Sequence, residues 1–217
     1  MRAYHGDVTI KNKYMRRVAV HAKADRLVQG EGWTGKKGCA VGCTLEAYDH
    51  SRYPIELGIP EHVARLEDCI FEGLSRREAL RWPTRFLDAV PVGADLSMVW
   101  PRFAIWLLEV CVKRQGLPPD TATTLDAVAA LYRRRIDGNE PAKKEWNSAA
   151  GTAWTAGTAA RTAAWAARAA AGTAAWAAAW AAAWAAAWAA AGAVHWRACA
   201  DKLVELLKTS PVSGKRK

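Results

Sequence analysis

Apolar residues recur along much of the chain at intervals of three and four positions, the spacing that places side chains on one face of an α-helix. The segment "YPIELGIPEHVARLEDCIFEGL" is the clearest case. Its apolar stripe is formed by Val63, Leu66, Ile70 and Leu74, and Pro60 stands where a helix would begin. The pattern predicts a buried amphipathic helix here.

Other segments repeat this pattern. Residues 11–29 predict a helix with basic residues between its apolar positions, capped by Asp7 or Thr9 and ended by Gly30. Residues 98–114 are strongly apolar and predict a core helix. No run of alternating β-branched residues is long enough for a strand, so the sequence predicts an all-α protein.

Two more helices follow from local signals. Ser75 and Glu78 have the spacing of a capping box, which predicts a helix start, and Pro83 interrupts or ends that helix. Residues 125–136 read "LDAVAALYRRRI" and predict a short amphipathic helix that ends in three arginines.

After residue 141 the composition changes to alanine with recurring tryptophan. Trp154, Trp165 and Trp176 are eleven residues apart, which keeps them on one helical stripe. We expect Ala/Trp-rich helices packed as a hairpin or bundle, or as the interface of a homodimer or higher homo-oligomer, because an exposed aromatic face would aggregate. Residues 169–194 are uncharged, but alanine is weakly apolar and the tryptophans are not gathered at the ends, so we expect no membrane span.

These features divide the chain into three parts. Residues 1–140 are expected to form a helical domain with a Gly/Lys/Cys loop, residues 141–210 the Ala/Trp-rich helical segment, and residues 211–217 a basic tail. The 217 residues carry a formal net charge of +10, which favours polyanionic partners such as nucleic acid or phosphorylated small molecules. No secretory signal is recognisable, and five scattered cysteines indicate reduced thiols in a cytoplasm.

The segment "GEGWTGKKGCAVGC", residues 30–43, is the main candidate for chemistry. Gly30, Gly35 and Lys36 have the spacing of a Walker A loop, but Lys37 stands where magnesium binding requires Ser or Thr. The preceding residues predict a helix where a P-loop needs a strand. We therefore exclude a nucleotide hydrolase of this type.

A weaker phosphate site remains consistent with the segment. Glycines let backbone amides converge on an anion, lysines add charge, and an aromatic ring stacks on a base. The candidate ligand-binding residues are Tyr4, His5, Trp33, Gly35, Lys36, Lys37, Gly38 and Gly42.

Cys39 and Cys43 offer two other interpretations. Zinc binding would need four ligands and has no second CxxC or HxxxH pair here, so we predict no metal and no cofactor. A catalytic cysteine would need a base, for which His21 and His50 are candidates, with Asp25 or Asp49 to orient it. Buried structural thiols would look the same in the sequence.

Several phrases resemble a group of uncharacterised phage and prophage proteins. The phrases are "YHGD", "GKKGCAVGCTL", "YPIELGIPEHVARLEDCIFEGL" and "FLDAVPVGADLS", followed by an alanine tail studded with aromatics. The resemblance covers nearly the whole chain and implies no activity or catalytic residue. It implies a setting, that of a phage-encoded accessory protein in the cytoplasm of a bacterial host.

In this setting we expect a non-enzymatic protein that counters host defence by binding and sequestering a phosphorylated nucleotide-type signal. Three alternatives stay open. One is a nucleic-acid-binding accessory protein that uses the basic N-terminal third and the "SGKRK" tail. Another is a cysteine-dependent enzyme acting on a nucleotide, and the last is a protein–protein inhibitor acting through the Ala/Trp helices.

Overall fold

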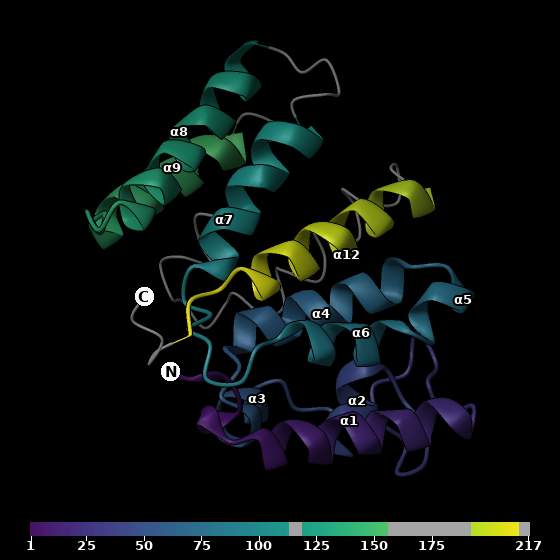
Figure 1. Ribbon diagram of the computed structural model, residues 1–217. Helices are drawn as coiled ribbons and strands as arrows, with labels where there is room; N and C mark the ends of the chain where they lie inside the picture. The colour runs from purple at the N-terminus through teal and green to yellow at the C-terminus, as the bar shows by residue number, and fades with distance from the viewer. Residues whose placement is uncertain (113–118, 156–191, 213–217) are drawn as a thin grey trace. The chain divides into compact units, whose positions relative to one another are not determined.

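The computed structural model describes residues 1–112, 119–155 and 192–212, and these residues form an all-α fold, as predicted (Figure 1). They belong to two compact units. Unit 1 comprises Met1–Trp100 and Ala193–Lys217, and unit 2 comprises Pro101–Gly192. Within the described residues, β-structure is limited to isolated bridges.

Unit 1 opens with a short 3-10 helix, η1 (Ala3–Gly6). Its α-helices are α1 (Val8–Lys23), α2 (Ala40–Leu45), α3 (Arg52–Leu57), α4 (Glu61–Gly73), α5 (Arg76–Ala79), α6 (Trp82–Ala89) and most of α12 (Gly192–Lys208). Helix α7 (Val99–Trp106) runs on into a π-helix, η2 (Leu107–Val112). Unit 2 continues with α8 (Pro119–Ile136) and α9 (Lys143–Thr155).

Helix α4 supplies much of the core of unit 1. Its predicted stripe is confirmed, since Val63, Leu66 and Ile70 are fully buried and Leu74 is nearly so. Burying each such side chain contributes roughly 1.5–3 kcal/mol to stability. The six residues of α2 are also all buried, although the sequence pattern predicted only a loop there.

Helix α1 begins as predicted and ends six residues early. The Asp7 carboxylate accepts a hydrogen bond from the Thr9 amide, which caps the first turn. The helix stops at Lys23 because Asp25 adopts a left-handed conformation with φ of 53°. The residues that follow pair with Gly38 through two backbone hydrogen bonds, from the Val28 amide and to the Arg26 carbonyl.

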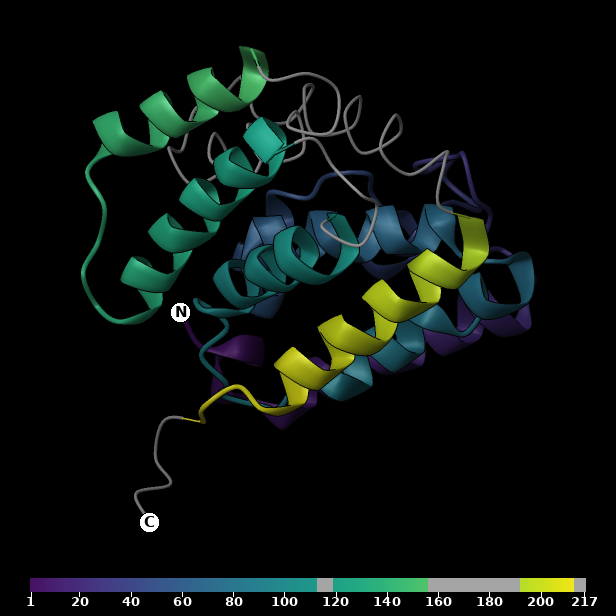
Figure 2. The same cartoon turned by 90° about the horizontal axis from the view of Figure 1, so that it is seen from above.

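Within unit 1, helix α12 packs beside α4, α5 and α6 (Figures 1 and 2). The Trp196 ring covers Gly73 so closely that a Cβ there would lie 1.9 Å from the indole. The Arg197 guanidinium pairs with Glu78 at 2.5 Å. The Ser75 hydroxyl bonds the same carboxylate in place of the backbone bond that a capping box requires.

The division into units differs from the parts expected from composition. The expected boundary at residue 140 falls between α8 and α9, which pack against each other. Tyr132 and Trp146 place their ring centroids 4.8 Å apart, and the Arg134 guanidinium pairs with Glu145 at 2.5 Å. The change in composition shows where the alanine- and tryptophan-rich sequence begins, whereas the contacts between α8 and α9 show which helices belong to one compact unit.

The prediction of packed Ala/Trp helices, a homo-oligomer interface and the basic "SGKRK" tail falls largely outside the described residues. Helix α9 covers the start of the Ala/Trp-rich segment and α12 covers its end. In the described part of the chain, no helix combines the length and apolar character needed to cross a bilayer.

Candidate functional site

The lysines of the glycine-rich segment lie at the tip of a tight hairpin. Trp33 and Gly38 form an antiparallel bridge, and the Thr34 amide donates to the Lys37 carbonyl at 2.9 Å. Gly35 sits at the turn with φ of 86°, a conformation that favours glycine. The amides of Gly35 and Lys36 donate no hydrogen bond to any described residue, so both can serve an anion.

A cavity of about 420 Å³ lies beside this hairpin; we call it the loop pocket. Its cations are Arg26, Lys36 and Lys37, and the rest of its lining is Ala24, Asp25 and Thr34. Lys37 pairs with Glu31 at 3.2 Å and Asp25 approaches Arg76 at 3.8 Å, both at exposed positions where such pairs are weak. Lys36 has no ion pair with a described residue. The pocket is therefore electropositive.

The other glycines of the segment serve close packing. A Cβ on Gly38 or Gly42 would lie 2.2 or 1.9 Å from the Gly32 carbonyl oxygen, and one on Gly32 would strike the Tyr48 ring at 2.5 Å. The Gly38 amide donates to the Arg26 carbonyl, and the Gly42 amide donates to the Cys39 sulfur. Gly38 and Gly42 are therefore parts of the scaffold, and their amides are unavailable to a phosphate.

Tyr4 and His5 do not join the loop pocket. Tyr4 is fully buried and its hydroxyl donates to the Leu87 carbonyl at 2.7 Å, so its ring cannot stack on a ligand. His5 is exposed and bonds the Ile55 carbonyl. Both precede α1, whose length of about 24 Å separates them from the hairpin at its other end. Trp33 adjoins the pocket residue Thr34 and meets His21 edge-on at 5.5 Å.

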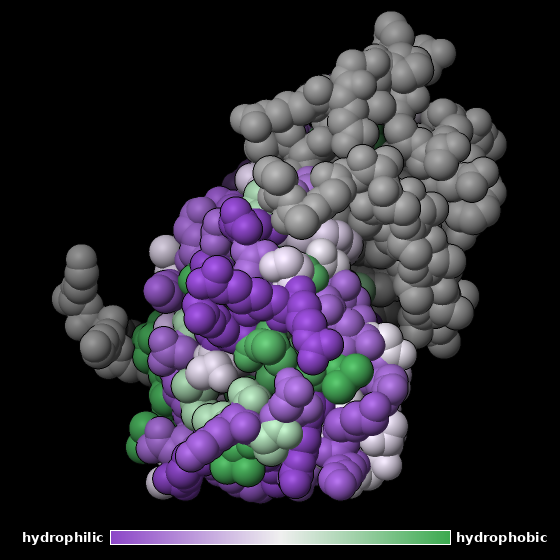
Figure 3. All heavy atoms as spheres, turned by 90° about the vertical axis from the view of Figure 1, so that its right-hand side faces the viewer, coloured by the Kyte–Doolittle hydropathy of each residue, from purple (hydrophilic) through white to green (hydrophobic). Residues whose placement is uncertain are grey.

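The basic residues of α1 have mixed roles. Lys11 donates to the carbonyls of Asp88 and Val90, and Arg17 donates to the Thr44 carbonyl, so both hold the fold together. Arg16 and Lys23 are exposed. The described surface in Figure 3 is mostly hydrophilic, with smaller hydrophobic patches between. The positive charge is thus only partly available to a partner.

Cys39 lies among acidic side chains rather than beside a base. The Cys39 sulfur, one carboxylate oxygen of Asp68 and one of Glu72 all lie within 4.8 Å of one another. We call these three residues the thiol–carboxylate cluster. The His50 ring and the Tyr48 hydroxyl reach the same Asp68 oxygen, Oδ2, at 3.1 and 3.3 Å. The sequence prediction of no metal overlooked this grouping.

Neither predicted cysteine has the environment of a nucleophile. Burial, and then the Asp68 charge, raise the pKa of Cys39 far above its ordinary value. Burial raises the pKa of Cys43 to about 11, and its thiol donates to the Arg26 and Gly38 carbonyls. Both thiols are protonated at neutral pH, whereas a catalytic cysteine needs a lowered pKa.

The predicted bases are also elsewhere. His21 contacts Glu46 at 3.3 Å and His50 contacts Asp68, and no hydrogen bond joins either ring to either thiol in the described residues. Asp25 faces Arg76. Asp49 accepts hydrogen bonds from the amide and the hydroxyl of Ser51, the hydroxyl at 2.6 Å, and within the described residues it bonds no histidine ring.

Sequence reasoning missed Asp68 and Glu72, although a signal was present. They are four residues apart on α4, so they share one face of that helix. Asp68 and its neighbour Glu67 are buried, which is unusual for carboxylates. Burial raises the pKa of Glu72 to about 7, with a smaller contribution from Asp68. The sequence signal for this site was the presence of acidic residues on or beside the apolar face of a strongly periodic helix.

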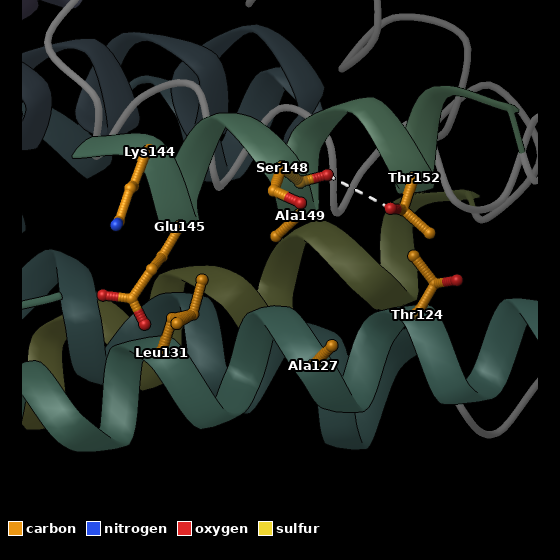
Figure 4. A pocket seen from close by; sticks show the side chains of 8 residues that line it. All are labelled: Thr124, Ala127, Leu131, Lys144, Glu145, Ser148, Ala149 and Thr152. Carbon is orange, nitrogen blue, oxygen red and sulfur yellow. Dashed lines mark hydrogen bonds between the residues drawn. The ribbon is translucent and has the colours of Figure 1, made fainter. Parts of the chain in front are cut away.

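Unit 2 has its own cavity of about 510 Å³ between α8 and α9. Figure 4 shows side chains from both helices facing it, among them Leu131, Ala127 and Thr124 from α8 and Ser148 and Glu145 from α9. Glu145 is already paired with Arg134. The lining mixes three apolar residues with hydroxyl and charged side chains, and its described residues include no histidine or cysteine that could act as a base or nucleophile.

Comparison with known proteins adds no assignment. No family model, no curated protein sequence and no solved structure matches the chain.

Proposed function

We propose that the protein binds a phosphorylated nucleotide-type molecule in the loop pocket and holds it without converting it. The observation that carries this proposal is the loop pocket itself, where Arg26, Lys36 and Lys37 line one cavity. The unbonded amides of Gly35 and Lys36 add two donors for a phosphate. A hydrogen bond to a charged group contributes about 1.5–3 kcal/mol, so a few such contacts suffice for useful affinity.

The chemistry around the pocket supports binding over turnover. Phosphate recognition needs cations and amide donors, and both are present. The two thiols nearby, Cys39 and Cys43, are held protonated by burial, which disfavours attack on a substrate. Trp33 is half-buried beside Thr34 and is the aromatic residue best placed to stack on a base.

The biological part of the proposal rests on the resemblance of the N-terminal phrases to phage and prophage proteins. In a bacterial cytoplasm, a phage protein that sequesters a nucleotide signal would blunt a defence triggered by that signal. We therefore propose a counter-defence role in the host cytoplasm, exercised by binding alone.

The experiment combines ligand release with titration. The full chain is purified from bacteria that carry nucleotide-signalling defences, denatured, and the supernatant is analysed by mass spectrometry. We expect a stoichiometric nucleotide, released unchanged. Titration of the stripped protein with that nucleotide should show about 100-fold weaker binding for Lys36→Ala/Lys37→Ala, since two charged hydrogen bonds of about 1.5 kcal/mol each are lost.

The matched control is Lys143→Ala/Lys144→Ala, which removes the same charge from two adjacent exposed lysines in unit 2. It should bind like the wild type. Equal affinity of the wild type and the Lys36/Lys37 variant for every nucleotide tested would overturn the pocket assignment. Binding that instead follows DNA or RNA, and that falls steeply with salt, would favour the nucleic-acid alternative.

A further inference from the structure

The thiol–carboxylate cluster gathers three potential ligand atoms from two elements. Cys39 is the N-cap residue of α2, and Asp68 and Glu72 project from successive turns of α4. One donor atom of each lies within 4.8 Å of the other two. The Cys39 amide donates to the Glu31 and Gly32 carbonyls, so the glycine-rich segment fixes the position of this residue.

The lone pairs in the cluster are only partly used. Asp68 Oδ2 accepts from His50 and Tyr48, whereas Oδ1 is buried and accepts no hydrogen bond of normal geometry from the described residues. The Asp68 side chain is 9% exposed. The Cys39 thiol also interacts with the Asp68 carboxylate, but a thiol is a weak donor. A buried carboxylate oxygen satisfied this poorly is costly, because it has lost its hydration and gained little in return. This under-satisfied oxygen is the second observation that points to a ligand.

The charge balance points the same way. Asp68 and Glu72 lie one turn apart on α4, and no lysine or arginine forms an ion pair with either of them in the described part of the chain. Among the described residues, Glu72 Oε2 accepts a hydrogen bond from the Gly30 amide alone, at 2.7 Å. Asp68 and Glu72 disfavour each other's negative charge in this partly buried site, and a bound cation would remove that penalty.

We propose that Cys39, Asp68 and Glu72 form a binding site for a divalent transition metal, with zinc as the best fit. A thiolate sulfur with carboxylate oxygens suits zinc and cobalt, whereas calcium and magnesium prefer oxygen ligands throughout. Three protein ligands leave one position of a tetrahedral zinc open. On binding, the Cys39 S–H bond breaks, the sulfur bonds to the metal, and the proton leaves to solvent.

The surroundings support the site. Zinc–sulfur bonds of about 2.3 Å and zinc–oxygen bonds of about 2.0–2.2 Å place ligand atoms roughly 3.5 Å apart, so the cluster needs to contract by about 1 Å. His50 and Tyr48 hold Asp68 from outside, as partners of metal ligands commonly do. Tyr48 and Glu72 are exposed, which gives an ion a route from solvent.

The test uses cobalt as a spectroscopic probe. The full chain is stripped with a chelator and titrated with Co²⁺, and then Zn²⁺ is added. We expect a thiolate-to-cobalt charge-transfer band at a stoichiometry of one, which Zn²⁺ then abolishes. Cys39→Ser should lose the band. Cys43→Ser, which alters a neighbouring buried thiol outside the cluster, should keep it.

Glu72→Gln keeps the test decisive if Cys39→Ser fails to fold, because residue 72 is exposed. We expect it to weaken metal affinity by at least about tenfold while preserving the helical circular-dichroism spectrum. Absence of the band in the wild type, its persistence in Cys39→Ser, or unchanged affinity in Glu72→Gln would each overturn the proposal.

Discussion

At the scale of single residues, the glycines of the glycine-rich segment have two structural roles, an exposed turn and close packing. Gly35 and Lys36 form an exposed turn whose amides are unbonded within the described residues. Gly32, Gly38 and Gly42 are positions of close packing. A Cβ on Gly38 or Gly42 would strike the Gly32 carbonyl oxygen, and a Cβ on Gly32 would strike the Tyr48 ring. The sequence predicted that glycines matter here, but it could not separate turn from packing, because both need the same residue type.

Substitution of two glycines tests this division. Gly42→Ala places a Cβ 1.9 Å from the Gly32 oxygen, and we expect a loss of about 3 kcal/mol or more in the free energy of unfolding. Gly35→Ala meets no atom within 4 Å and suffers only a positive φ, which costs about 1–2 kcal/mol. Urea denaturation of both variants measures the difference. A smaller loss for Gly42→Ala than for Gly35→Ala would contradict the packing role.

At the scale of elements, helix α4 had a buried apolar face that the sequence predicted well and buried carboxylates that the sequence did not predict. Its stripe from Val63 to Leu74 was visible in the sequence because a 3.6-residue period dictates which positions are buried. The buried carboxylates Glu67 and Asp68 break that rule, and their partners Tyr53 and His50 come from segments upstream along the chain. Local periodicity holds no information about such partners, so this part of the site could not be predicted.

The contact between α4 and α12 can be tested with a double-mutant cycle. Gly73→Ala should destabilise the protein by about 1–3 kcal/mol, because its Cβ would strike the rigid Trp196 ring. Trp196→Ala alone should cost about 3 kcal/mol. In the Trp196→Ala background the Gly73→Ala change should become neutral or favourable, since alanine is the better helix former. Additive free energies from thermal or urea melts would show that the two residues are not in contact.

At the scale of the whole molecule, unit 1 is built from two separate stretches of chain. Composition suggested three consecutive parts, because the sequence becomes rich in alanine and tryptophan after residue 141. It could not show that α12 returns to the first stretch, where Cys199, Leu203 and Leu207 are fully buried. That assignment depends on side-chain fit at positions such as Gly73, far away in sequence.

Truncation tests whether α12 is an integral part of unit 1. A chain ending at residue 192 lacks the buried face of α12, and we expect it to melt at a lower temperature and to aggregate, because the apolar surface of unit 1 is exposed. A chain ending at residue 212 removes only the basic "SGKRK" tail and should melt like the full chain. Calorimetry and size-exclusion chromatography of both chains measure this. A fully stable, monomeric chain of 192 residues would show that α12 is dispensable to unit 1.

The same two-part construction sets an order of events during synthesis. When Trp100 leaves the ribosome, unit 1 still lacks α12, which follows only after residues 101–192 have been translated. At ordinary translation rates this delay lasts roughly 5–20 s, which is long compared with the folding of small helical domains. A nascent chain therefore displays an unfinished apolar surface for many seconds. Chaperones that bind such surfaces have that interval in which to engage it.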